Sequence, residues 1–115
     1  MSRSRKAIQD LIATADLLKQ MRKVDVHPGD LLFVKTCNSV YTLRMIDHAE
    51  CLASGGWFDE KGLSPWRVRI TGCTWGGTSI KIDILAACGL CIEFANHVTT
   101  SEIRMIMLMP YWTSN

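Results

Sequence analysis

The segment from residue 31 to residue 108 is a close succession of short stretches rich in strand-forming residues. Several stretches alternate apolar and polar residues, as in IKIDI at 80–84 and LCIEF at 90–94. Such alternation gives a strand one apolar and one polar face. The gaps are too short for the helical crossovers that parallel strands need, so we expect an antiparallel sheet. The predicted strands are 31–36, 39–46, 50–54, 66–73, 80–84, 90–94 and 102–108.

Seven short strands are enough to close a small barrel, which would leave no unpaired strand edge. Upstream of them, an apolar stripe predicts an amphipathic α-helix from about residue 4 to residue 23. Its members are Ile8, Leu11, Ile12, Ala15, Leu18 and Met21. The Pro-Gly pair at 28–29 ends that pattern. We therefore predict a mainly β fold, a small antiparallel β-barrel of about six or seven short strands preceded by one N-terminal amphipathic α-helix.

The chain of 115 residues has the length of a single domain, with the helix within 1–23, the barrel at 31–108 and a tail at 109–115. Its 48% hydrophobic and 21% charged residues exclude a disordered class. No apolar run approaches the roughly 20 residues of a membrane span and no signal-peptide pattern is present, so we expect a cytoplasmic protein with reduced cysteines. Residues 1–23 hold six basic and two acidic side chains, and the rest holds seven basic and nine acidic ones, so the positive charge belongs to the predicted helix.

The last predicted strand is apolar on both faces in its second half. Ile103, Met105 and Met107 would share one face, while Ile106 and Leu108 lie on the other. Either the N-terminal helix covers the extra face within the chain, or a second subunit covers it. We favour a homo-oligomer, with a dimer as the commonest solution. The predicted interface comprises Ile106, Leu108, Tyr111 and Trp112.

Several short sequence motifs lie along the β part of the chain. They are PGD before a strand, NSVYTL, SGGWFD, TGCTWGG followed by IKIDI, and VTTSEIRMI. Together they resemble a family of small bacterial proteins with a predicted β-barrel core, over about residues 26–108. The resemblance implies the fold and brings no activity, cofactor or functional residue with it.

The two-residue spacing of Cys88 and Cys91 suits a zinc site or a redox pair. A tetrahedral zinc site needs four ligands, and Cys73, His27 and His97 could join only if the fold brought them together. A thioredoxin-like motif begins a helix, whereas Cys91 falls inside an alternating strand. We therefore expect buried structural cysteines and no metal or cofactor.

The longest gap between predicted strands carries Trp57 and Phe58, and long loops are often functional. With Trp75 and His48, these residues could form a small-molecule or enzyme site at the mouth of the barrel. His48 and Glu50 share a strand face, so the histidine could act as a general base. A solvated turn histidine is the simpler interpretation, and we predict no catalytic residue.

Aromatic residues together with Arg67, Arg69 and Lys81 are the ingredients of a single-strand nucleic-acid platform. The β part is net negative, however, whereas a nucleic-acid binder needs a basic stripe. We expect Arg67 and Arg69 to pair across strands with Asp83 or Glu93. Nucleic acid is thus a disfavoured partner. The helix has no Trp or Phe in its apolar stripe, so we expect it to pack on protein rather than on a membrane.

These observations favour a non-enzymatic, self-associating module whose role is binding or scaffolding. The first alternative is the small-molecule or enzyme site at the barrel mouth. The second is single-stranded nucleic-acid binding through aromatic and arginine side chains.

Overall fold

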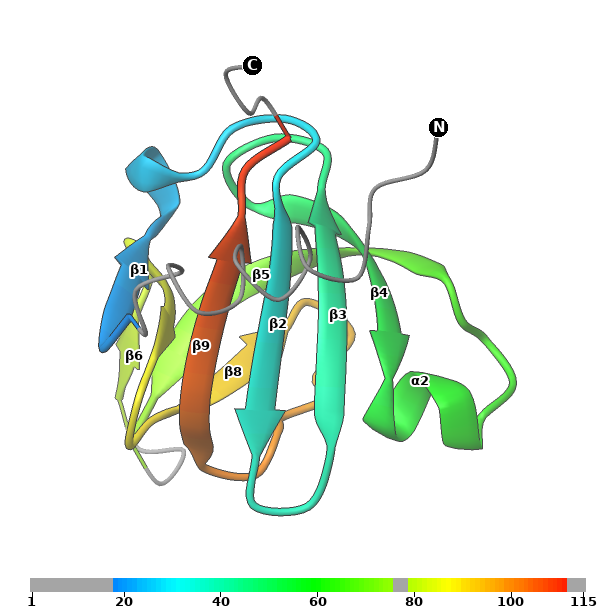
Figure 1. Cartoon of the computed structure of the whole chain (residues 1–115). Helices are drawn as coiled ribbons and strands as arrows, with labels where there is room; N and C mark the ends of the chain where they lie inside the picture. Colours follow the sequence, from blue (N-terminus) through cyan, green and yellow to red (C-terminus); the bar gives the residue numbers. More distant parts are fainter. Residues whose placement is uncertain (1–17, 76–78, 112–115) are drawn as a thin grey trace, which may run out of the picture.

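The computed structural model describes residues 18–75 and 79–111, and its regular structure is mainly β (Figure 1). In chain order, its elements are β1 Gln20–Arg22, the 3-10 turn η1 Lys23–Asp25, β2 Leu31–Thr36, β3 Val40–Met45, β4 Glu50–Gly55, helix α2 Gly56–Glu60, β5 Trp66–Thr74, β6 Ile80–Lys81, β7 Ile84–Ala87, β8 Cys91–Phe94 and β9 Ile103–Met109. Within those two ranges, no helix has the length and apolar character needed to cross a membrane.

The main sheet has the strand order β6-β5-β4-β3-β2-β9, with β8 also paired to β5, and every pairing is antiparallel. Strands β1 and β7 form a separate antiparallel pair. The sheet curls into a half-barrel, with β9, β2 and β3 standing in front of β5 and β8 (Figure 1). The mainly β, antiparallel fold predicted from the alternation and the short gaps is confirmed.

Over the described residues, the half-barrel does not close into the predicted barrel. Strand β9 has a ladder with β2, and only isolated bonds reach its other edge. Leu18 donates its N–H to the carbonyl oxygen of Ile106 at 3.2 Å. Ile103 accepts from the N–H of Gly89 at 2.9 Å and donates to the carbonyl of Leu90 at 2.8 Å. These bonds tie the edge of β9 to the rest of the fold without a continuous ladder.

The prediction of one continuous strand at 80–84 is wrong, because two short strands, β6 and β7, occupy this region. β6 ends at Lys81 beside the end of β5, and the chain then turns so that β7 pairs with β1. Ile82 lies in the turn and is 64% exposed, whereas all four residues of β7 are buried. Gly72 permits the close passage of this chain, because a Cβ there would lie 2.4 Å from the Lys81 carbonyl oxygen.

The N-terminal helix does not extend to Lys23 as predicted. Residues 4–17 lie outside the described part, but Gln20–Arg22 is a strand and Lys23–Asp25 is a 3-10 turn. Met21 is buried opposite Ala86 of β7, with its neighbours along β1 exposed. Pairing with β7 provides partners for the backbone N–H and C=O groups of β1. One buried residue between two exposed ones is compatible with a short strand as well as with a turn of helix, so the sequence pattern did not distinguish them.

Helix α2 was not predicted, and it carries the centre of the core. It directly follows β4 and folds Phe58 under the curled sheet, where the side chain is fully buried. The ring of Phe58 packs edge to face on Phe94 of β8, with centroids 5.1 Å apart, and on Tyr41 of β3 at 6.2 Å. One aromatic residue from a short helix therefore joins strands from both sides of the half-barrel.

Candidate functional site

The outward side of β9, β2 and β3 carries a row of apolar side chains. Opposite residues in an antiparallel ladder share a face, and Leu32, Val34 and Ile106 are buried on the inner side. Their neighbours along the strands therefore face outward. We call these residues the outer patch: Leu31, Phe33, Val40, Met105, Met107 and Met109. Val40 is 52% exposed and the other five are half-buried.

A β-bulge explains why Ile103 and Ile106, which are three residues apart in β9, both face the core. Lys35 pairs with Met105, whereas Thr36 pairs with Ile103, so Arg104 is an extra residue in β9. The bulge shifts the alternation by one position, and both Ile103 and Ile106 become buried. The prediction that Ile103 shares a face with Met105 is therefore wrong. Alternation rules alone do not reveal a bulge.

Of the four residues that the sequence suggested for an oligomer interface, Ile106 lies in the core instead, because the bulge turns it inward. Leu108 is half-buried and packs against that core. Tyr111 is 71% exposed, and Trp112 lies outside the described residues. The apolar surface that β9 presents outward consists of its methionines.

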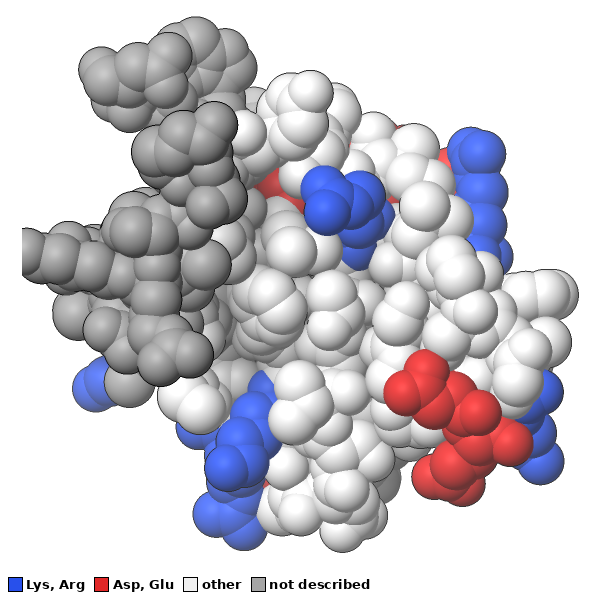
Figure 2. Space-filling view, turned by 45° about the vertical axis from the view of Figure 1, so that its right-hand side comes forward, with Lys and Arg blue, Asp and Glu red and all other residues white. Residues whose placement is uncertain are grey.

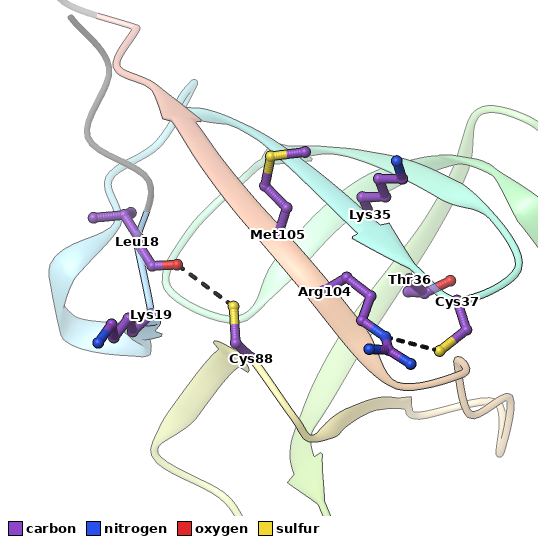
Figure 3. A pocket seen from close by; sticks show the side chains of 8 residues that line it. All are labelled: Leu18, Lys19, Lys35, Thr36, Cys37, Cys88, Arg104 and Met105. Atoms are coloured by element: carbon purple, nitrogen blue, oxygen red, sulfur yellow. Dashed lines mark hydrogen bonds between the residues drawn. The ribbon is translucent and has the colours of Figure 1, made fainter.

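A pocket of about 820 Å³ lies where the outer patch meets the bulge (Figure 3). Its lining residues come from four distant parts of the chain: Leu18, Lys19, Lys35, Thr36, Cys37, Cys88, Arg104 and Met105. Backbone bonds hold these parts together. The N–H of Cys88 donates to the Lys19 carbonyl at 2.8 Å, and the N–H of Cys37 donates to the Glu102 carbonyl at 2.9 Å. The walls thus rest on β-structure rather than on a free loop.

The pocket is positively charged. Lys19 and Lys35 stand on opposite sides of β9, and Arg104, at the bulge, lies on the side of Lys35 and Cys37 (Figure 3). Arg104 has one ion pair, with Glu102 at 3.5 Å. Within the described residues, no salt bridge involves Lys19 or Lys35, and no carboxylate lines the pocket. A pocket with this charge attracts anions.

Two thiols face the same pocket. Arg104 donates its Nε–H to the Cys37 sulfur at 3.1 Å, and Cys88 donates to the Leu18 carbonyl at 3.6 Å (Figure 3). The bond to Cys37 is the main cause that raises the pKa of Arg104, so the guanidinium stays charged. Both thiols are exposed, whereas Cys51 and Cys73 are buried. Burial raises the pKa of each of these two to about 12.

This contrast predicts the order of cysteine alkylation. Iodoacetamide should modify Cys37 and Cys88 first in the native protein, because the thiolate is the nucleophile and access is needed. Cys51 and Cys73 should react only after unfolding. Peptide mass spectrometry of samples quenched at successive times measures each rate. Native-state modification of Cys51 as fast as that of Cys37 would contradict the described burial.

The structure does not gather the residues proposed for a site at the barrel mouth. Phe58 is fully buried, and Trp57 is half-buried with its ring 5.3 Å from that of Phe58. His48 precedes β4 while Trp57 follows it, so they lie at opposite ends of that strand. Trp75 is 71% exposed after β5. None of the four lines the charged pocket.

The suggested general base also lacks its partner. His48 Nδ1 lies 2.8 Å from the carbonyl oxygen of Val26. Glu50 instead accepts from Arg67 Nε at 2.8 Å, a contact that lowers the pKa of this carboxyl. Arg67 thus pairs with β4, and the predicted pairing with Asp83 or Glu93 is wrong for this residue. The reason is the sheet order, which places β4 next to β5.

Cys88 and Cys91, the pair noted for its two-residue spacing, differ in their exposure to solvent. Cys88 is exposed and lines the pocket, whereas Cys91 is half-buried on β8, where burial raises the pKa of its thiol. Among residues 18–75 and 79–111, no group of three His, Cys, Asp or Glu side chains is arranged to hold a metal ion. The spacing motif drew attention to Cys88, but no local signal pointed to Cys37 and Arg104.

No protein-family model, curated protein or solved structure matches this chain. The β-rich core that the resemblance to small bacterial proteins implies is present, but these comparisons identify no family.

Proposed function

We propose that this protein is a non-enzymatic binding module that holds a small organic anion in the pocket beside β9. The observation that carries the proposal is that Lys19, Lys35 and Arg104 all line one pocket, with no carboxylate among its described lining residues. A small-molecule site was one of the functions expected from the sequence. The site proposed here lies on the outward face of the half-barrel, whereas the sequence suggested a site at the barrel mouth.

The donor set favours a carboxylate or phosphate group. The Arg104 guanidinium donates through Nε to Cys37 and pairs through Nη2 with Glu102, which leaves further N–H groups for a ligand. Lys35 on the neighbouring strand adds a second charge that can approach the same anion. Charge-assisted hydrogen bonds of this kind are stronger than neutral ones. We therefore assign Arg104 and Lys35 as the principal anion contacts.

The remaining walls indicate what the rest of the ligand is like. Leu18 and Met105 contribute apolar surface, and lysine stems add methylene groups. Most small-molecule sites combine such apolar walls with a few polar groups that orient the ligand. A ligand with an anionic head and a short apolar body fits this lining better than a bare inorganic ion does.

A titration with octanoate and, separately, with inorganic phosphate tests the proposal. Two-dimensional ¹H–¹⁵N NMR should show shifts at the amides of residues 35–37 and 104–105, with octanoate the tighter probe. Arg104→Gln should weaken octanoate binding about tenfold, since a hydrogen bond to a charged group contributes about 1.5 kcal/mol or more. Lys35→Gln should weaken it less, and added salt should weaken it further.

Lys61→Gln is the matched control, because Lys61 is an exposed lysine at the end of α2 and does not line the pocket. It should bind octanoate as the unchanged protein does. Equal loss in Lys61→Gln and Arg104→Gln would show non-specific attraction and contradict the assigned pocket. Absence of shifts at residues 35–37 and 104–105 would contradict it as well.

A further inference from the structure

We propose that residues 4–17 of the same chain lie across the outer patch and cover it. This inference concerns the apolar face of β9, β2 and β3, which shares Met105 with the lining of the pocket. It opposes the expectation that a second copy of the chain covers β9.

The face itself needs cover. Five of its six members are large apolar side chains that stand outward on adjacent strands, with Phe33 opposite Met107 and Leu31 opposite Met109. Figure 2, in which the right-hand side of Figure 1 comes forward, shows that most of the described surface in view carries neither basic nor acidic residues. A contiguous apolar area of this kind on a small protein marks a contact surface.

The described chain begins beside this face. Leu18 donates its N–H to Ile106 of β9 and packs partly buried against the core, so the described chain begins at the edge of β9. Residues 4–17 would span about 21 Å as a helix. Three adjacent strands are about 10 Å across, and six residues of strand extend about 20 Å. The segment is therefore long enough to cover the patch without a linker.

The composition of the segment matches the face. Ile8, Leu11, Ile12 and Ala15 form one apolar side at helical spacing, which suits a surface filled by adaptable methionine side chains. The segment thus offers an apolar side to the patch.

Covalent attachment favours this segment over a second copy. A segment anchored at Leu18 meets the patch at an effective concentration of millimolar order or above. A second copy has to reach the same face from solution and loses its free translation and rotation on binding. The two occupants compete for one surface, so the attached one prevails at micromolar protein.

Methionine oxidation tests the inference on the full chain. Hydrogen peroxide oxidises accessible methionines, and peptide mass spectrometry reports each position separately. Met105 and Met107 should be protected in the unchanged protein. The double substitution Leu11→Lys with Ile12→Lys should raise their oxidation rates by about fivefold or more, because two ammonium groups cannot be buried on the apolar face.

The matched control is Gln9→Lys with Ala13→Lys, which adds the same charge on the opposite side of the predicted helix and should leave the rates unchanged. Buried Met45 and Met21 are internal standards, and their slow oxidation in every variant shows that the half-barrel is still folded. Equal rates for Met107 in both double variants and the unchanged protein would overturn the inference. Protection that grows with protein concentration would overturn it in favour of a second copy.

Discussion

Replacement of Phe58 by alanine is expected to lower the free energy of unfolding by about 3–5 kcal/mol, the usual cost of emptying a phenylalanine site in a core. Phe58 is fully buried, and its ring contacts the rings of Tyr41, Trp57 and Phe94. Domains of this size are stable by only about 5–15 kcal/mol, so the loss is a large share of the total. Urea denaturation followed by circular dichroism measures it.

Phe58→Leu is the control, because it keeps most of the apolar volume and should cost less than about 1.5 kcal/mol. The difference between the two variants in free energy of unfolding gives the cost of the cavity, separate from any general effect of a substitution in α2. Equal destabilisation by leucine and alanine would mean that the aromatic contacts of Phe58 do not organise the core.

Gly55→Ala is expected to have the second large effect, about 3 kcal/mol or more. Gly55 joins β4 to α2 with a φ of 91°, a backbone conformation that costs a residue with a side chain about 1–3 kcal/mol. An added Cβ would also lie 2.1 Å from the carbonyl oxygen of Val40 on the paired strand. Relief of that contact has to move β3 away from β4 or shift α2, and with it Phe58.

Gly62→Ala separates the two causes. Gly62 also has a positive φ, 68°, but nothing lies within 4 Å of its added Cβ. We expect this variant to lose only about 1–2 kcal/mol, the cost of the left-handed conformation. Urea denaturation of both proteins provides the comparison. A cost at Gly62 as large as at Gly55 would show that close packing against Val40 contributes nothing.

The local part of the fold could be predicted because it depends on neighbouring residues. Strand β2 occupies residues 31–36 as expected, and the short gaps correctly imply antiparallel neighbours. The prediction failed where a distant partner decides the structure. Met21 is part of a strand because β7 is beside it, and the 80–84 stretch divides because its two halves pair with different strands.

The candidate site could be predicted only in fragments. Cys88 was noticed for its spacing to Cys91, yet its neighbours in the pocket are Lys19 and Arg104, far away in the sequence. Arg104 faces the pocket at a bulge that no pattern in the last strand revealed. Phe58 was proposed as a ligand contact because it falls in a long gap, but a short helix turns it into the core.

The sequence by itself therefore determined the class of this protein: a mainly β, antiparallel chain whose alternating residues divide each main strand into a buried and an outward face. Alternation and gap length are properties of adjacent residues, and they act before any distant contact forms. Only the tertiary structure decided where the sheet stops curling, which residues of β9 face the core and which charges share a pocket. Those outcomes depend on register, on one extra residue at Arg104 and on backbone bonds between distant segments, such as the one from Leu18 to Ile106.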